Sequence, residues 1–387
     1  MKIVILSRHL HPPVDAVGEY ATQLGKALAE RGVAVSWVTS ARPMSGPAPT
    51  SAKVYPIVRN WGWIAMFQLS VFLRRSNAEV VNLQFVPQMY GRYGLALPVA
   101  ALPLLVRLFA KMPVVTTCHE LLSFHPSSLK GRLLQVVYFL QTSLILLGSY
   151  KVVVPTEWQE RQLRLFFPWF FRKVQRIPVG SNVPAPDSIR TPAGPAKAHP
   201  GSILMGTFGT GHPWWQYEAV LELLGKTRER GIDARLLCIG DIEGNNPERY
   251  RRLRELESRL VLTGFVHWTH RCSMEEVSHY LQSLDIFLAL QNTGITARST
   301  ALVAAMAHGL PIVATRGPLA DRWLLDSGAL MVVEPDDLAS ILRAIVVLVE
   351  DPQKRKNLGR HARSFYERNL RREVIADQFL AVLKGVV

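Results

Sequence analysis

Residues 292–301 combine one glycine, several hydroxyl groups and one arginine between a predicted strand and a predicted helix. Ser and Thr side chains cap helix N-termini, glycine lets the backbone approach a ligand, and arginine can bind a phosphate through two parallel hydrogen bonds. A helix N-terminus also favours negative charge. The pattern therefore predicts a diphosphate site, and the alternative is a capped helix with a solvated arginine. The candidate residues are Gly294, Thr296, Arg298, Ser299 and Thr300.

A second glycine-rich stretch, "GTFGTGHPWW", follows the strand predicted at 202–209 and precedes a helix that starts near Tyr217. A loop of this kind can hold a phosphate through its backbone amides. Its spacing is neither the dinucleotide fingerprint nor a Walker A motif. We take Gly209 and Thr210 from this loop as candidate donor-binding residues.

Two further candidates lie in the first half of the chain, each at the end of a predicted strand. Gly18 opens the helix that follows the first strand, where free amides could point at a ligand, or it is only a turn glycine. His119 and Glu120 end the strand predicted at 114–120. A histidine there can contact a sugar hydroxyl or steady charge near a reaction centre, and the alternative is a packed histidine bonded to a backbone carbonyl.

The elements that position these residues alternate between strand and helix along the whole chain, as in doubly wound parallel sheets. A Pro-, Ala- and Gly-rich stretch at 186–202 reads as a linker. We therefore expect two Rossmann-like domains, 1–185 and 203–369, with a C-terminal helix at 370–387 that joins the first. Ligands bind beyond the carboxyl ends of parallel strands, so two such domains would face a cleft. The strands are predicted at 2–7, 33–39, 79–85, 114–120, 150–155, 174–180, 202–209, 235–241, 260–266, 286–291, 311–315 and 329–335.

Composition limits the class of protein. Of 387 residues, 48% are hydrophobic and 19% are charged, which argues for a folded globular chain. The three cysteines are far apart, which suits a reducing compartment, and the first ten residues are a poor signal peptide. The apolar segments 95–112 and 133–150 are interrupted by Pro, Arg or Gln, so we expect buried helices rather than membrane spans.

The formal charge of +15 predicts attraction to polyanions. No nucleic-acid-binding motif is present, so we expect no nucleic-acid partner. Aromatic and basic residues cluster at 59–75 and 166–176, which suits a bilayer interface or, equally, a core beside solvated arginines. We expect a cytoplasmic protein, peripheral at the inner face of an anionic membrane.

Several motifs together resemble glycosyltransferase family 4, namely "HPPVDAVGEY" at 11–20, "VVTTCHE", "TGFV" at 263–266 and "AAMAHGLPIVAT" at 304–315. The resemblance implies a GT-B fold and retaining sugar transfer from a nucleotide-sugar to a saccharide or lipid-linked acceptor. It implies no metal and no other cofactor. It places His119 beside the reacting sugar, and the base pocket at Gly264, Phe265 and Val266. Gly294, Ile295 and Thr296 would hold the diphosphate and donor sugar.

The sequence departs from the family pattern in two ways. The family usually has two glutamates separated by seven residues, and this chain has Thr296 and Ala304 at those positions. The usual diphosphate cations after the first strand of the second domain are missing, apart from His212. Either Arg298 or Arg316 has taken over the cation, or the chain is an inactive scaffold for a partner glycosyltransferase. A sugar-nucleotide epimerase would need more carboxylates, and a phosphorylase would need a lysine for its pyridoxal cofactor.

Overall fold

The computed structural model describes residues 1–10, 15–41, 53–121, 129–186 and 201–387. These residues form two compact units. The first unit is Met1–Pro178 together with Arg372–Val387, and the second is Val179–Arg371. The first boundary is therefore Pro178 rather than residue 185, and most of the stretch expected to be a linker lies outside the described residues. The fold class is the predicted one, two doubly wound parallel α/β sheets.

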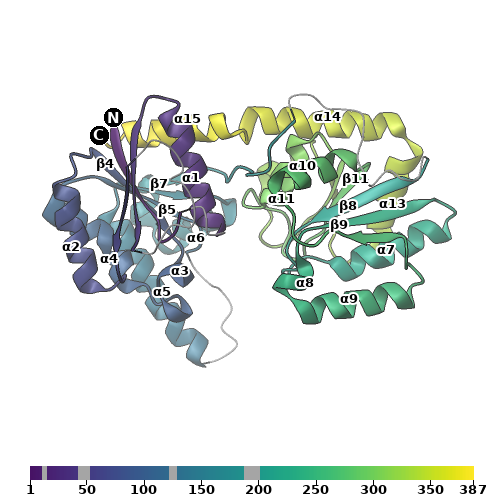
Figure 1. The fold of residues 1–387 in the computed structure, drawn as a ribbon, viewed down its shortest axis with the longest axis horizontal. Coiled ribbons are helices and arrows are strands. Elements are labelled where there is room, and N and C mark those ends of the chain that lie inside the picture. Colours follow the sequence, from purple (N-terminus) through teal and green to yellow (C-terminus); the bar gives the residue numbers. More distant parts are fainter. Residues whose placement is uncertain (11–14, 42–52, 122–128, 187–200) are drawn as a thin grey trace. The chain divides into compact units, whose positions relative to one another are not determined.

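The sheet of the first unit has seven parallel strands in the order β3-β2-β1-β4-β5-β6-β7. Helices cover both of its faces (Figure 1). One face packs on α1 (Ala16–Ala29) and α15 (Arg372–Lys384), and the other on α2 (Trp63–Arg74), α4 (Leu97–Leu105) and α5 (Leu129–Gly148). The edge strand β3 was not predicted, because Pro56 interrupts its apolar pattern. The strands are β1 (Lys2–Leu6), β2 (Ala34–Ser40), β3 (Val54–Val58), β4 (Val80–Phe85), β5 (Val114–Cys118), β6 (Lys151–Val154) and β7 (Val174–Arg176).

The sheet of the second unit has six strands in the order β10-β9-β8-β11-β12-β13, again all parallel. Its helices include α7 (Tyr217–Glu229), α9 (Pro247–Arg259) and α13 (Leu338–Glu350) on one side, and α10 (Met274–Ser283), α11 (Thr300–Ala307) and α14 (Pro352–Asn369) on the other (Figure 1). The strands are β8 (Ile203–Phe208), β9 (Ala234–Ile239), β10 (Val266–Trp268), β11 (Ile286–Ala289), β12 (Ile312–Thr315) and β13 (Met331–Val333).

The last helix of the chain belongs to the first unit. Helix α14 ends at Asn369 and α15 begins at Arg372, close to the start of the C-terminal helix expected at 370–387. Ile375 and Phe379 of α15 are buried in the cluster that α1 also covers. On its rim Arg31 donates to the carboxylate of Asp377 and to the backbone carbonyl of Glu373.

One predicted strand, 260–266, was wrong by several residues. Helix α9 runs to Arg259, and Val261 has a positive φ of 55°. Gly264, with φ 87°, turns the chain once more, and only then does β10 begin at Val266. The apolar run "LVL" is therefore a helix end and a turn, in which Leu262 alone is fully inserted into the core.

The two apolar segments expected to be buried helices are helical but not fully buried. Segment 95–112 contains α4 and the π-helical turn η2 (Val106–Ala110), and segment 133–150 lies mostly in α5. Each packs one side on the sheet and exposes large apolar side chains on the other, among them Leu108 and Val136. Within the described ranges, none of the helices has the length and apolar character needed to cross a bilayer.

Candidate active site

Two loops meet at the carboxyl edge of the second sheet, between the neighbouring strands β8 and β11. The chain leaves these two strands in opposite directions, which makes this the switch point where ligands bind in doubly wound sheets. Two backbone hydrogen bonds join the loops, from Gln216 N to Leu290 O (3.1 Å) and from Asn292 N to Trp214 O (3.0 Å). The structure thus brings together the predicted glycine loop after β8 and the predicted phosphate loop after β11.

The loop after β11 is held by close backbone packing at Gly294. This residue has φ 81°, and a Cβ there would lie 2.5 Å from the backbone nitrogen of Gly317. Ile295 N donates to Thr315 O (3.3 Å), and the buried carboxylate of Asp321 accepts a hydrogen bond from Ala297 N (2.6 Å). Only glycine fits at 294, so the shape of the loop is set before any ligand arrives.

Helix α11 begins directly behind this loop. Ser299 is its N-cap, and its Oγ accepts from Leu302 N (3.3 Å). Thr296 and Thr300 are half-buried and Arg298 is exposed, whereas the side chain of Ile295 is fully buried, so Ile295 can offer only its backbone. The predicted hydroxyls, arginine and helix N-terminus therefore lie together within a few residues of one another.

Arg298 acts electrostatically on the neighbouring loop. The pKa of His212 is lowered, first by desolvation and then by the positive charges of Arg298 and Arg249. The His212 ring stacks on Trp214. The neutral form of His212 is therefore favoured, and Arg298 and Arg249 both supply positive charge beside this loop.

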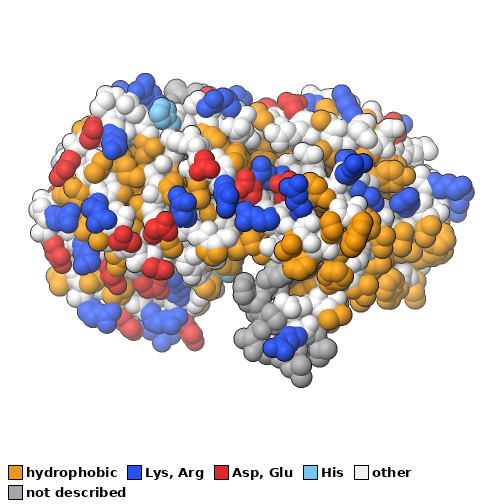
Figure 2. All heavy atoms as spheres, turned by 180° about the vertical axis from the view of Figure 1, so that it is seen from behind, with side chains coloured by type: hydrophobic (Ala, Val, Ile, Leu, Met, Phe, Trp, Pro, Cys, Tyr) orange, Lys and Arg blue, Asp and Glu red, His pale blue; other side chains and the backbone are white. Residues whose placement is uncertain are grey.

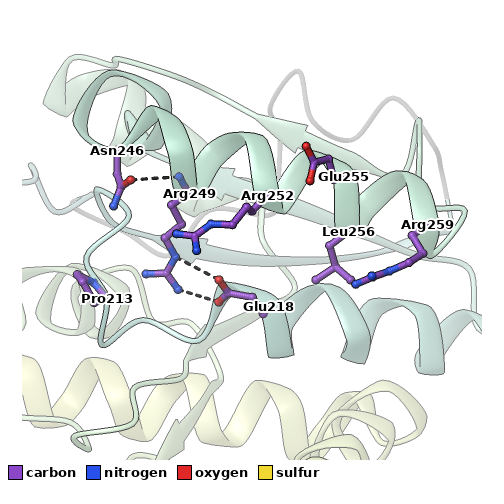
Figure 3. Close-up of a pocket in the computed structure, with 8 residues that line it drawn as sticks. All are labelled: Pro213, Glu218, Asn246, Arg249, Arg252, Glu255, Leu256 and Arg259. Atoms are coloured by element: carbon purple, nitrogen blue, oxygen red, sulfur yellow. Dashed lines mark hydrogen bonds and ion pairs between the residues drawn. The ribbon is translucent and has the colours of Figure 1, made fainter.

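Sequence reasoning missed Arg249, the side chain that shapes the loop after β8. Its guanidinium donates to the backbone carbonyls of His212 (2.6 Å) and Trp215 (2.6 Å), and to Glu218 on α7. Figure 3 shows Arg249 of α9 pointing toward Glu218. Both residues line a groove of 790 Å³. The only sequence signal was one arginine among many in "PERYRRLRE", with no pattern that distinguished it.

Gly209 and Thr210, the first two residues of the loop after β8, lie in different environments. Gly209 N donates to Ile239 O (3.0 Å), so its amide serves the sheet edge rather than a ligand. Thr210 is exposed beside it. The roles of Gly209 and Thr210 in donor binding stay predictions.

The predicted base-pocket residues lie at the other edge of the sheet. Gly264 and Phe265 precede the parallel strand β10, and Val266 is its first residue, so all three are at its amino end. Gly264 O accepts from Arg235 Nη1 (3.1 Å), and the guanidinium of Arg228 lies 3.4 Å from the ring centre of Phe265. The structure does not bring these residues to the two loops.

The residues after β10 occupy the carboxyl edge instead. Thr269 Oγ1 accepts from Gly240 N (3.0 Å), and the ring of His270 lies 3.1 Å from the carboxylate of Glu243. The base-pocket roles of Gly264, Phe265 and Val266 stay predictions.

In the first unit, His119 lies at the carboxyl end of β5 and is buried. Its Nε2 is 2.8 Å from Gln84 Oε1, while Gln84 Nε2 donates to Asn82 Oδ1. Because the amide of Gln84 is oriented by Asn82, its oxygen faces the ring and His119 Nε2 must carry the hydrogen. The edge of the ring contacts Tyr20 on α1, with ring centres 4.9 Å apart.

Gly18 and Glu120 lie at the same carboxyl edge of the first sheet as His119. Gly18 N donates to Asp15 Oδ1 (3.1 Å), the N-cap of α1, so the free amide expected there is occupied. Asp15 in turn lies 2.9 Å from His9 Nδ1. Glu120 follows His119 and is half-buried. Their roles remain predictions.

Comparison with known protein families decides the identity of the chain. A model described as Glycosyltransferase Family 4 matches residues 17–183, and one described as Glycosyl transferases group 1 matches residues 203–351. The chain belongs to glycosyltransferase family 4. The two matched ranges fall in the two units, so this family 4 glycosyltransferase carries both halves of the fold.

Solved structures give the same fold for this glycosyltransferase over nearly its whole length. Sucrose-phosphate synthase from Thermosynechococcus elongatus is 17% identical, with a TM-score of 0.73 over 99% of this chain and 98% of that one. A glycosyltransferase from Rickettsia africae ESF-5 is 15% identical, with a TM-score of 0.74 over 100% and 98%. HepE from Anabaena, solved with UDP and glucose, is 15% identical, with a TM-score of 0.72 over 100% of both chains. No curated protein sequence matches.

Ala304, where this glycosyltransferase lacks the usual family glutamate, is fully buried in α11. Its carbonyl is 2.7 Å from His308 Nδ1, and His308 Nε2 is 2.8 Å from Ser278 Oγ. This part of α11 therefore packs into the core, and polar groups are left only at the start of the helix.

Proposed function

We propose that the chain transfers a sugar from a nucleotide-sugar to a saccharide or lipid-linked acceptor, with retention of configuration and without a metal ion or other cofactor. The observation that carries the donor assignment is the pairing of the two loops at the switch point between β8 and β11. One similar structure, HepE, was solved with UDP and with UDP-glucose. Retention and metal independence follow from the family resemblance.

Each group in the proposed donor site would have its own role. The departing diphosphate would meet the N-terminus of α11, the hydroxyls of Thr296, Ser299 and Thr300, and the guanidinium of Arg298. Fixed donors aimed at developing charge are the largest contribution to catalysis in many enzymes. His119 would contact the sugar and Glu120 would orient the sugar or the acceptor. The described parts of the two units supply these groups separately.

Nucleotide binding tests the donor assignment directly. We would measure the thermal unfolding of the full chain with UDP, GDP, ADP or dTDP, in the presence of EDTA. A nucleotide at about 100 times its Kd adds about 2.7 kcal/mol to the stability of the fold that binds it, which raises Tm by roughly 5–10 °C for a unit of this size. We expect a shift with one nucleotide, and the same shift without EDTA.

An inactive scaffold is the second candidate, and Ala304 is the observation in its favour, because the residue that usually binds the donor ribose is missing. A scaffold has no need of a nucleotide site. If no nucleotide shifts Tm, with or without Mg²⁺, the transferase proposal fails and the scaffold takes its place. A shift that appears only with Mg²⁺ would overturn the metal-free mechanism and leave the donor site standing.

A further inference from the structure

The charge of the protein is concentrated on one unit. The first unit has 22 basic and nine acidic residues, a formal charge of +13, whereas the second has 23 basic and 21 acidic residues, a charge of +2. A charge of this size attracts anionic surfaces over distances of about one Debye length, roughly 8–10 Å in ordinary salt. The polyanion that the sequence predicts is therefore a partner of the first unit.

Exposed apolar side chains are concentrated on the same unit. Seventeen of the eighteen large hydrophobic residues that are exposed in the described part of the chain belong to it, and Val261 is the exception. Figure 2 shows hydrophobic side chains gathered over the first unit with Lys and Arg among them and few acidic groups, while acidic and basic groups mix on the second unit. A patch of this extent on one face marks an interaction surface.

Four helical elements, α2, η2, the end of α5 and the 3-10 helix η3 (Pro168–Lys173), contribute to this surface, which we call the apolar–basic band. Phe67 of α2 contacts Phe109 of η2, with ring centres 5.1 Å apart. Arg107 of η2 lies over the ring of Tyr150, just after α5 (5.5 Å). Lys173 of η3 donates to the carbonyls of Leu146 (2.8 Å) and Ser149 (2.9 Å). The elements are therefore in contact in that order.

The apolar–basic band contains both large exposed apolar side chains and cations. Ile64 on α2, Leu108 on η2 and Trp169 on η3 are exposed by 77%, 61% and 86%. The same elements carry exposed cations: Arg74 and Arg75 are at the end of α2, Arg107 and Lys111 are in and after η2, and Arg172 is in η3. The clusters at 59–75 and 166–176, which the sequence left open between core and interface, each divide between the two: Met66, Leu69, Leu73 and Phe167 are buried in the core, and the other aromatic and basic residues of each cluster are exposed or half-buried.

We propose that the first unit docks on an anionic lipid bilayer through the apolar–basic band. Aromatic and aliphatic tips beside cations suit the boundary between acyl chains and anionic headgroups. A protein partner would need acidic groups to complement the same cations, and a second copy of this unit, at +13, repels itself. Docking lies outside the donor site and does not depend on nucleotide binding.

The test is flotation of the full chain with two kinds of vesicle, phosphatidylcholine alone and phosphatidylcholine mixed with an equal part of phosphatidylglycerol. We expect binding to the anionic vesicles, weakened by salt. Ile64→Ser/Leu108→Ser/Trp169→Ser should abolish it, while Val261→Ser, the matched change on the second unit, should not alter it. Because each headgroup-facing cation contributes about fivefold, Arg74→Gln/Arg75→Gln should weaken binding about 30-fold. Arg251→Gln/Lys356→Gln on the second unit is the charge control.

Docking would be overturned if the protein bound neither kind of vesicle, or if the triple variant bound as well as wild type. It would also be overturned if the wild-type protein self-associated instead of binding lipid and the triple variant did not self-associate. This last result would make the band an interface between copies. The exposed positions keep the fold intact, and the thermal transition of each variant checks this. If the triple variant still shows the nucleotide-induced Tm shift, its donor site is intact. A failure of membrane docking can then be told apart from a failure of the donor site.

Discussion

The guanidinium of Arg249 and the carboxylate of Glu218 form a two-point ion pair, with Nη2 2.7 Å from Oε2 and Nε 3.3 Å from Oε1 (Figure 3). The arginine is buried, and it also donates to the backbone carbonyls of three residues in the loop after β8, Gly211, His212 and Trp215. One side chain thus fixes the loop that faces Arg298.

Arg249→Met should loosen this loop. Several backbone carbonyls lose a charged donor, so we expect a loss of about 3 kcal/mol in the unfolding free energy of the second unit and weaker nucleotide binding. Glu218→Gln should cost less, because the contacts to the carbonyls remain. Urea unfolding and nucleotide titration measure both effects. Arg252→Met, an exposed change on the same helix, is the control, and equal losses in Arg249→Met and Arg252→Met would contradict this role.

Arg298→Ala removes the exposed cation at the start of α11. If its guanidinium meets the charge that develops on the diphosphate, kcat should fall by about 10²-fold or more. The fold should be unaffected because the side chain is exposed. Arg343→Ala, another exposed arginine on α13, should behave like wild type. Normal turnover in Arg298→Ala would remove this residue from the mechanism and turn attention to Arg316.

His119→Asn separates sugar chemistry from donor binding. The ring lies in the first unit, whereas the proposed nucleotide loops lie in the second. We therefore expect transfer to fall by about 10²-fold or more while the nucleotide-induced Tm shift is preserved. His361→Asn, at an exposed position on α14, is the control. Loss of the nucleotide shift together with transfer would point to a folding defect instead.

His308 should make the second unit acid-sensitive. Desolvation, aided by the charge of Arg363, lowers the pKa of His308 to about 4, although its hydrogen bond to Ala304 O opposes the shift. In the unfolded chain the pKa of this histidine is near 6.5. The neutral buried ring therefore makes its full contribution to the unfolding free energy above pH 6.5, and this contribution is lost as pH falls toward 4. The unfolding free energy of the second unit should fall by about 3 kcal/mol over this pH range. Urea unfolding at a series of pH values measures it.

His308→Gln should flatten this pH dependence, because the group that takes up the proton is gone. His279→Gln changes an exposed histidine on α10 and should leave the slope as in wild type. An unchanged slope in His308→Gln would assign the acid sensitivity to other groups.

The alternation of strand and helix was predictable because parallel strands buried on both faces need continuous apolar runs, as in β1, β5 and β11. The phosphate-loop candidates were predictable for a similar reason, since Gly294 and Ser299 have local conformational roles that their residue types reveal.

Other features depend on contacts that no local pattern encodes. Leu262 and Gly264 read as a strand, yet α9 and two residues with positive φ place them in a turn. Arg249 is one of several arginines on its helix until the loop it holds is in place. Leu108 and Phe109 look like core residues because hydrophobicity alone does not tell which side of a helix faces the sheet.

The return of α15 to the first unit affects how the protein is made. Ile375 and Phe379 complete the core beneath α1, but the ribosome delivers them only after the whole second unit has been synthesised. Chains normally fold their N-terminal domains first. Here the unit made second can close first, while the unit made first waits with one sheet face covered by α1 but not yet by α15.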